Sequence, residues 1–227
     1  MKEEISEEQR VRELVERYNI DLSKLEQEQI KFAKNLSFKD SIIFDTAERI
    51  AGIENVFVGN KIVSAIIVLQ NGEIVEQEYF EDKIRFPYIP GFRAYRELPS
   101  MIQAFNKLDE KPDLVFLKGH GSLHPRGLGV ASHFALIAGV PTIGIADSLV
   151  VGEIQNDNVS MNGKILGKVI STKEGANPIY VSPGNNISLK SSVDMTRRMT
   201  VEPHKFPEPL RLARKYAKEV AEELSLE

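Results

Sequence analysis

Two short segments combine residues suited to binding nucleic acid with residues suited to acid–base or metal chemistry. In the first, residues 86–97, Tyr88 lies between Pro87 and Pro90, and Glu97 follows shortly after. Proline fixes its own φ and keeps the preceding residue out of the helical region, so we expect Tyr88 to sit on a stiff, extended loop. A rigid aromatic beside a carboxylate suits a protein that pushes a wedge between stacked bases and acts on a nearby phosphodiester. Taken alone, this segment is better explained as a proline-rich surface loop with a packed tyrosine.

The second segment changes that balance. Residues 112–126 form an apolar run followed by a glycine-rich turn that contains His120, His124 and Arg126. A helical pattern comes next, and then another short apolar run over 140–146. Together with the Pro-Tyr-Ile-Pro loop, these motifs resemble the endonuclease V family.

The resemblance extends from about residue 27 to the segment 207–209. It implies an RNase H-like fold and a metal-dependent nuclease that recognises deoxyinosine in DNA, or inosine in RNA, and cuts the second phosphodiester on the 3′ side. Backbone groups of the turn 119–121 and the following loop would grip a flipped hypoxanthine, because glycines let the backbone approach a ligand closely. Tyr88 would fill the gap left in the stack. The nucleic-acid-binding residues that the resemblance implies are Pro87, Tyr88, Ile89, Pro90, Gly91, Gly119, His120, Gly121 and Arg126.

The resemblance fails at the metal ligands. The family holds its metals with three carboxylates, and the matching positions here are Glu54, Glu97 and Lys118. A lysine of the family is matched by Asp147, so the chain has exchanged lysine and aspartate between two positions. One ligand is thus a methylene longer and another is replaced by a cation. Because His124 matches an active-site histidine of the family, the candidate catalytic residues are Glu54, Glu97, Lys118, His124 and Asp147.

Two interpretations of this exchange are open. Magnesium requires oxygen ligands in near-octahedral geometry, whereas the ammonium of Lys118 offers none and repels a divalent ion. In the first interpretation Asp147 replaces the lost ligand. The protein is then an active endonuclease whose Mg²⁺ or Mn²⁺ is held by Glu54, Glu97 and Asp147. In the second, Lys118 pairs with the remaining acids and fills the metal site. Catalysis is then impaired, and the protein binds inosine-type bases or distorted strands in DNA or RNA.

We favour the second interpretation because a cation at position 118 neutralises the acids that a metal would otherwise neutralise. A surface salt bridge of little energetic value is the simplest alternative. A further departure lies at 182–186, where Ser-Pro-Gly is followed by Asn185 and Asn186 in place of a histidine and a basic residue of the family.

Composition places limits on these hypotheses. The 227 residues, 42% of them hydrophobic, are compatible with a single domain over 1–227, in which 1–19 extends past the resembling region as a variable N-terminal arm. A net charge of −4 favours no strong non-specific binding to nucleic acid. Contact with a strand therefore requires a local basic patch, for which the candidates are Lys83, Arg85, Arg93, Arg96, Arg126, Arg197 and Arg198.

The chain has no cysteine, which excludes disulfides and thiolate catalysis. We also expect no membrane span and a cytoplasmic location, because no apolar run is long enough and the N-terminus is polar.

The expected elements form an α/β fold with an RNase H-like mixed sheet flanked by helices. Asn-Gly-type turns separate three strand-like runs and predict an antiparallel meander. Helices between the next strands predict parallel pairing through right-handed crossovers. Strands are predicted at about 49–58, 61–70, 73–82, 113–118, 142–147, 164–172 and 178–182. Helices are predicted at about 6–18, 22–37, 98–109, 128–138, 189–199 and 208–224.

Overall fold

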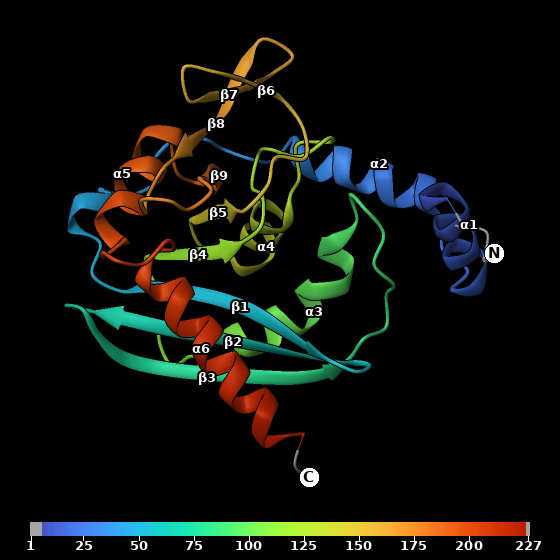
Figure 1. Ribbon diagram of the computed structural model, residues 1–227, viewed down its shortest axis with the longest axis horizontal. Helices are drawn as coiled ribbons and strands as arrows, with labels where there is room; N and C mark the ends of the chain where they lie inside the picture. The colour runs from blue at the N-terminus through green and yellow to red at the C-terminus, as the bar shows by residue number, and fades with distance from the viewer. Residues whose placement is uncertain (1–5, 226–227) are drawn as a thin grey trace.

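A nine-stranded mixed sheet forms the centre of the computed structural model, which describes residues 6–225 (Figure 1). The strand order is β3-β2-β1-β4-β5-β9-β8-β7-β6. The first three strands, β1 (Ile50–Val58), β2 (Lys61–Gln70) and β3 (Glu73–Lys83), form the predicted antiparallel meander. Its second turn places Asn71 and Gly72 at positive φ, as a tight hairpin requires.

Two parallel strands continue the sheet from β1. Strands β4 (Leu114–Lys118) and β5 (Thr142–Ala146) run parallel to β1, and their carboxyl ends therefore lie at one edge. Helix α3 (Arg93–Phe105) leads into β4, and α4 (Val130–Ala138) connects β4 to β5. Lys118 is aligned with Ile145 in this ladder, which brings the end of β4 next to residue 147.

The far half of the sheet is antiparallel. It contains β9 (Ile179–Asn185), β8 (Lys164–Ile170), β7 (Asn158–Met161) and β6 (Glu153–Gln155). In Figure 1 the last three project above the rest of the molecule. The sequence analysis did not predict β6 and β7, because they are short and carry little apolar alternation.

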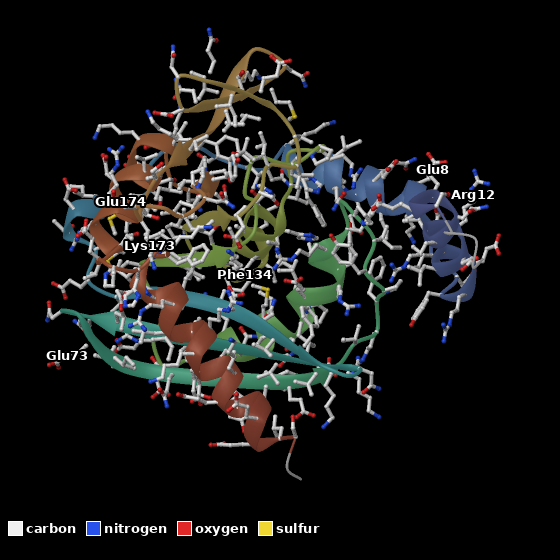
Figure 2. The ribbon with its side chains drawn as sticks, viewed as in Figure 1. Glu8, Arg12, Glu73, Phe134, Lys173 and Glu174 are labelled. Carbon is white, nitrogen blue, oxygen red and sulfur yellow. The ribbon has the colours of Figure 1, made fainter. Side chains whose placement is uncertain are left out.

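Helices cover both faces of the sheet and bury its alternating side chains. Helices α3 and α4 pack on the face formed by Ile53, Val115 and Leu117, where Phe134 is fully buried. Helices α5 (Leu189–Met199) and α6 (Glu208–Glu223) cover the opposite face. Figure 2 shows Phe134 in the side-chain-filled interior.

The N-terminal helices extend to one side of the sheet (Figure 1). Helix α1 (Glu7–Arg17) begins with the predicted capping box, formed by Ser6 and Gln9, and has no buried residue. Glu8 and Arg12 of α1 point away from the fold in Figure 2. Helix α2 (Leu22–Ala33) lies closer to the centre and buries Gln29. The first five residues of the proposed N-terminal arm lie outside the described residues.

The predicted helix boundaries need two corrections. The helix predicted over 98–109 begins at Arg93, so Glu97 lies inside its second turn and Pro99 in its interior. The helix predicted over 22–37 ends at Ala33, after which the chain turns. Between residues 6 and 225, no helix has the length and apolar character of a membrane span.

A glycine holds β5 against the turn 119–121. A Cβ atom on Gly144 would meet the backbone nitrogen of Gly121 and lie 2.6 Å from the carbonyl oxygen of Gly119. We therefore predict that Gly144→Ala lowers the free energy of unfolding by about 2 kcal/mol or more, because backbone atoms on both sides have to shift. Urea denaturation measures the loss.

Gly163→Ala is the matched control. Gly163 has a positive φ of 72° but nothing within 4 Å of the added atom, so its loss should be about 1 kcal/mol. Equal losses in the two variants would contradict the close packing of the turn against β5.

Candidate active site

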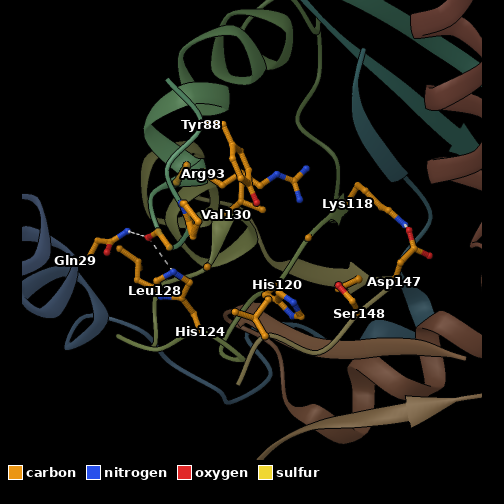
Figure 3. Close-up of a pocket in the computed structure, with 17 residues that line it drawn as sticks. Gln29, Tyr88, Arg93, Lys118, His120, His124, Leu128, Val130, Asp147 and Ser148 are labelled. Atoms are coloured by element: carbon orange, nitrogen blue, oxygen red, sulfur yellow. Dashed lines mark hydrogen bonds and ion pairs between the residues drawn. The ribbon is translucent and has the colours of Figure 1, made fainter. Parts of the chain in front are cut away.

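Many of the predicted site residues line a cavity at the carboxyl ends of β4 and β5 (Figure 3), whereas Glu54, Glu97 and Arg126 are not part of its lining. The cavity has a volume of about 280 Å³, near the lower end of the range for small-molecule pockets. Residues from four separate parts of the chain line it, among them Gln29, Tyr88, Arg93, Lys118, His120, His124 and Asp147. In Figure 3 Lys118 and Asp147 face each other on one side, with Gln29 and His124 on the opposite side.

The Pro-Tyr-Ile-Pro loop presents an aromatic side chain to this cavity. Tyr88 is 61% exposed, whereas its neighbours Pro87 and Ile89 are buried. The buried neighbours anchor the loop on both sides of the tyrosine. Tyr88 therefore lies on a loop outside the core, as the sequence predicted.

The carbonyl of Gly91 ties this loop to two distant segments. It accepts hydrogen bonds from Arg126 Nη2 at 2.8 Å, Gln29 Nε2 at 3.0 Å and His124 Nε2 at 3.1 Å. Arg126 also donates to Gln29 and to Glu26, and its guanidinium stacks 4.5 Å from the Phe92 ring centroid. Arg126 and His124 thus position the loop, and neither touches the acids of the site.

The site histidines are poised to remain neutral. Burial lowers the pKa of His120 to about 4, and the charge of Arg93 acts in the same direction. Burial likewise lowers the pKa of His124 to about 4, assisted by the charge of Arg126. In its neutral form His124 donates through Nε2 and accepts the Arg126 backbone N–H through Nδ1 at 3.3 Å.

The glycine-rich turn is a rigid wall of the cavity. The amide of Gly119 donates to the Ile145 carbonyl at 2.8 Å, and the amide of Gly121 donates to Ser182 Oγ at 2.9 Å. The carbonyls of His120 and Gly121 accept amides from the start of α4. These bonds fix the turn before any ligand arrives.

Glu97 is buried, and both of its oxygens are engaged. Its side chain is 4% exposed; Oε1 accepts from Arg93 Nε at 2.5 Å, and Oε2 accepts from Asn55 Nδ2 at 2.8 Å. Ser64 in turn donates to Asn55 Oδ1 at 2.6 Å. Burial acts to lower the pKa of Arg93, but the ion pair with Glu97 outweighs it, so the pKa lies above its ordinary value.

Lys118 forms an ion pair with Asp147, whereas Glu97, one of the remaining acids with which we expected it to pair, binds Arg93 instead. Lys118 Nζ lies 2.5 Å from Asp147 Oδ2, and Lys205 Nζ lies 2.9 Å from Oδ1 of the same carboxylate. The Phe206 ring packs beneath the Lys118 ammonium, with its centroid 3.7 Å away. Burial raises the pKa of Asp147, but the hydrogen bonds from the two lysines outweigh it and hold the pKa below its ordinary value. Burial lowers the pKa of Lys118 despite the partner carboxylate.

Glu54 approaches the site from the other face of the sheet. Asn55 points toward α3 and Glu97, so strand alternation directs Glu54 toward α6. The neighbouring even position, Gly52, packs directly against the start of α6. Burial raises the pKa of Glu54 to about 7, although the charges of Lys118, Arg93 and Arg214 act to lower it.

These donors do not fit a magnesium site. Both oxygens of Glu97 are bound by Arg93 and Asn55, and both oxygens of Asp147 are bound by lysines. An ammonium stands at the position of the third family ligand, where magnesium requires oxygen. Across residues 6–225 the structure contains no cluster of three or more acidic, histidine or cysteine side chains that could hold a metal ion. Glu54, Glu97 and Asp147 are therefore not brought together as one ligand set.

The sequence patterns did not predict several residues of the site. Gln29 and Asn55 act through hydrogen bonds to residues distant in sequence, and a lone amide carries no motif. Lys205 and Phe206 reach Lys118 because α6 starts against β1, a contact that only the folded topology creates. Asn185, which stands in place of a histidine of the family, is buried, and its Oδ1 accepts a hydrogen bond from the Ser37 amide at 2.7 Å.

Glu54 should impose a pH dependence on stability. Between its ordinary value of 4.5 and about 7, the folded protein keeps a proton that the unfolded chain releases. The free energy of unfolding therefore falls as the pH rises through this window. We predict that Glu54→Gln removes this fall and is more stable than the wild type at pH 8 by up to about 3 kcal/mol, with little difference at pH 4.

Urea denaturation at pH 4 and pH 8 tests this prediction. Glu208→Gln, which removes a partly buried carboxylate paired with Arg211, is the control and should show no such gain at pH 8. A Glu54→Gln effect of equal size at both pH values would contradict the raised pKa.

Comparisons with known proteins agree with this geometry. The family model described as Endonuclease V matches residues 30–215. The chain is 36% identical over 207 residues to Endonuclease V of Thermosipho melanesiensis, covering 87% of this chain and 88% of that protein. It superimposes with a TM-score of 0.83 on the crystal structure of the Bacillus subtilis Endonuclease_V, at 29% identity over 92% of this chain and 95% of that one. A Ciona intestinalis Endonuclease V, solved in complex with a 24mer DNA containing an inosine followed by a ribo-adenosine, shares the fold with a TM-score of 0.80, at 21% identity over 89% of this chain and 98% of that one. The chain belongs to the endonuclease V family.

Proposed function

We propose that this protein binds inosine-type bases in DNA or RNA and cuts the strand poorly or not at all. The observation that carries the proposal is the Lys118–Asp147 ion pair, in which Lys118 occupies the position that matches the third carboxylate of the family. A cavity lined by the exposed Tyr88 lies beside it.

The binding half of the proposal rests on the loop and the rigid turn. Tyr88 is exposed beside the cavity, and insertion of its ring would compensate for the stacking that a flipped base gives up. Hydrogen bonds at Gly91 fix the loop, so little ordering entropy is lost on binding. Crystallisation of the Ciona relative with inosine-containing DNA supports the choice of ligand.

The impaired half rests on the occupied carboxylates. Metal-assisted hydrolysis of a phosphodiester needs ions that activate water and stabilise the leaving oxygen. Here the two oxygens of Glu97 accept hydrogen bonds from Arg93 and Asn55. The two oxygens of Asp147 accept hydrogen bonds from two lysines. Because Glu97 and Asp147 are already paired with other side chains of the protein, we assign no step of strand cleavage to them.

A gel-shift and cleavage assay on end-labelled strands tests both halves. We predict that strands with a single inosine, as DNA and as RNA, are bound in EDTA and remain intact when Mg²⁺ or Mn²⁺ is added. Tyr88→Ala should weaken binding by roughly 1–3 kcal/mol, the usual contribution of one base–aromatic stack. Tyr18→Ala is the control, because Tyr18 is also exposed, at 44%, but does not line the cavity.

Two results would contradict the proposal. If Tyr88→Ala and the wild type bind the inosine-containing strand with equal affinity, Tyr88 does not act as a wedge. Cleavage beside the inosine that requires a divalent metal and disappears in Glu97→Gln would establish an active nuclease using Glu54, Glu97 and Asp147.

A further inference from the structure

Two lysines converge on one exposed carboxylate at the edge of the cavity. Lys118 and Lys205 bind separate oxygens of Asp147, at 2.5 and 2.9 Å. The two lysine side chains are only 16% and 21% exposed, whereas the Asp147 side chain is 49% exposed. The cations are therefore shielded, and the anion between them is on the solvent side.

The lysines are held from behind by an aromatic ring. The Phe206 centroid lies 3.7 Å from the Lys118 ammonium and 5.2 Å from that of Lys205. Such a contact stabilises an ammonium without supplying a counter-charge. The cation pair thus has a support that does not depend on Asp147.

The charges of this cluster are not balanced. Arg93 is neutralised by Glu97 through its own ion pair, so the Lys118–Asp147–Lys205 group has two cations for one ion-paired anion. Glu54 also acts on Lys118 through its charge, but the burial that raises the pKa of Glu54 to about 7 weakens this compensation near neutral pH. In addition, burial lowers the pKa of Lys118, which marks an ammonium short of solvation. A site of this kind favours an anion that offers several oxygens at once.

We propose that Lys118 and Lys205 bind one phosphate of a nucleic-acid backbone, and that Asp147 occupies this phosphate site until the strand displaces it. This inference rests on the proposed function. Lys118 and Asp147 line the same cavity as Tyr88 (Figure 3), and Lys205, which is not part of the lining, binds the other oxygen of Asp147. A strand whose base enters the cavity would therefore bring its backbone to Lys118 and, next to it, Lys205. The two lysine ammonium groups would then hold the phosphate without a metal ion, and EDTA would not weaken binding of the strand.

The test compares charge variants in strand binding at several salt concentrations. Asp147→Asn should tighten binding of an inosine-containing strand roughly fivefold, because the competing anion is removed while the side-chain shape is kept. Lys118→Gln and Lys205→Gln should each weaken binding and reduce the salt slope of log K by about 0.7, the value for one single-strand phosphate contact. Circular dichroism and thermal unfolding confirm that the variants are folded.

A second lysine–aspartate pair supplies matched controls. Asp194 has a side chain 50% exposed and pairs with Lys190 at 2.9 Å on α5, away from the cavity. Asp194→Asn and Lys190→Gln make the same charge changes as Asp147→Asn and Lys118→Gln. They should leave the affinity within about twofold of the wild type, because neither residue lines the cavity and exposed surface ion pairs contribute little.

The outcomes separate this inference from the proposed function. If the wild type binds no strand, both fail. If binding depends on Tyr88 but the three site variants behave like the controls, only the phosphate site fails. Calorimetric titration with inorganic phosphate distinguishes a strand phosphate from a free one. We expect no binding of phosphate tighter than millimolar to the wild type, and micromolar binding of inorganic phosphate would overturn the assignment to the backbone.

Discussion

The Lys118–Asp147 ion pair is the interaction on which the chemistry of this site depends. Parallel pairing of β4 and β5 aligns Lys118 with Ile145, so the residue two positions further on is within reach of the ammonium. Lys205 and Phe206 complete a small enclosed group around the pair. Two acids of the site are bound by cationic side chains, Glu97 by Arg93 and Asp147 by the two lysines.

The base-binding side of the site does not rely on these acids. Its loop is fixed through the carbonyl of Gly91, and its turn is fixed by the sheet and the start of α4. Arg93 connects the two sides, since it lines the cavity and binds Glu97. Under the proposed function, base recognition would persist without strand cleavage because the loop and the turn are held by bonds that do not involve Glu97 or Asp147.

Much of the fold follows from local patterns in the sequence. Apolar strands, Asn-Gly-type turns and the capping box at Ser6 predicted the meander, the parallel strands and most helices. The predicted start of α3 was wrong. Proline is common in the first turn of a helix, yet this helix begins at Arg93 and contains Pro99 in its interior. At the site, the pairing of Lys118 with Asp147 was expected from strand order. The participation of Lys205, Phe206, Asn55 and Gln29 was not, because each depends on contacts between distant segments.

The most direct test of the account is Mn²⁺ binding, measured by electron paramagnetic resonance without nucleic acid. The wild type is compared with a variant that combines Lys118→Asp, Glu54→Asp and Asp147→Lys, with both proteins shown to be folded. The account predicts no stoichiometric Mn²⁺ on the wild type at concentrations below about 1 mM, and one or more bound ions on the variant. Stoichiometric Mn²⁺ on the wild type, lost in Glu97→Gln, would show that the ion pair yields to the metal and would contradict the central claim.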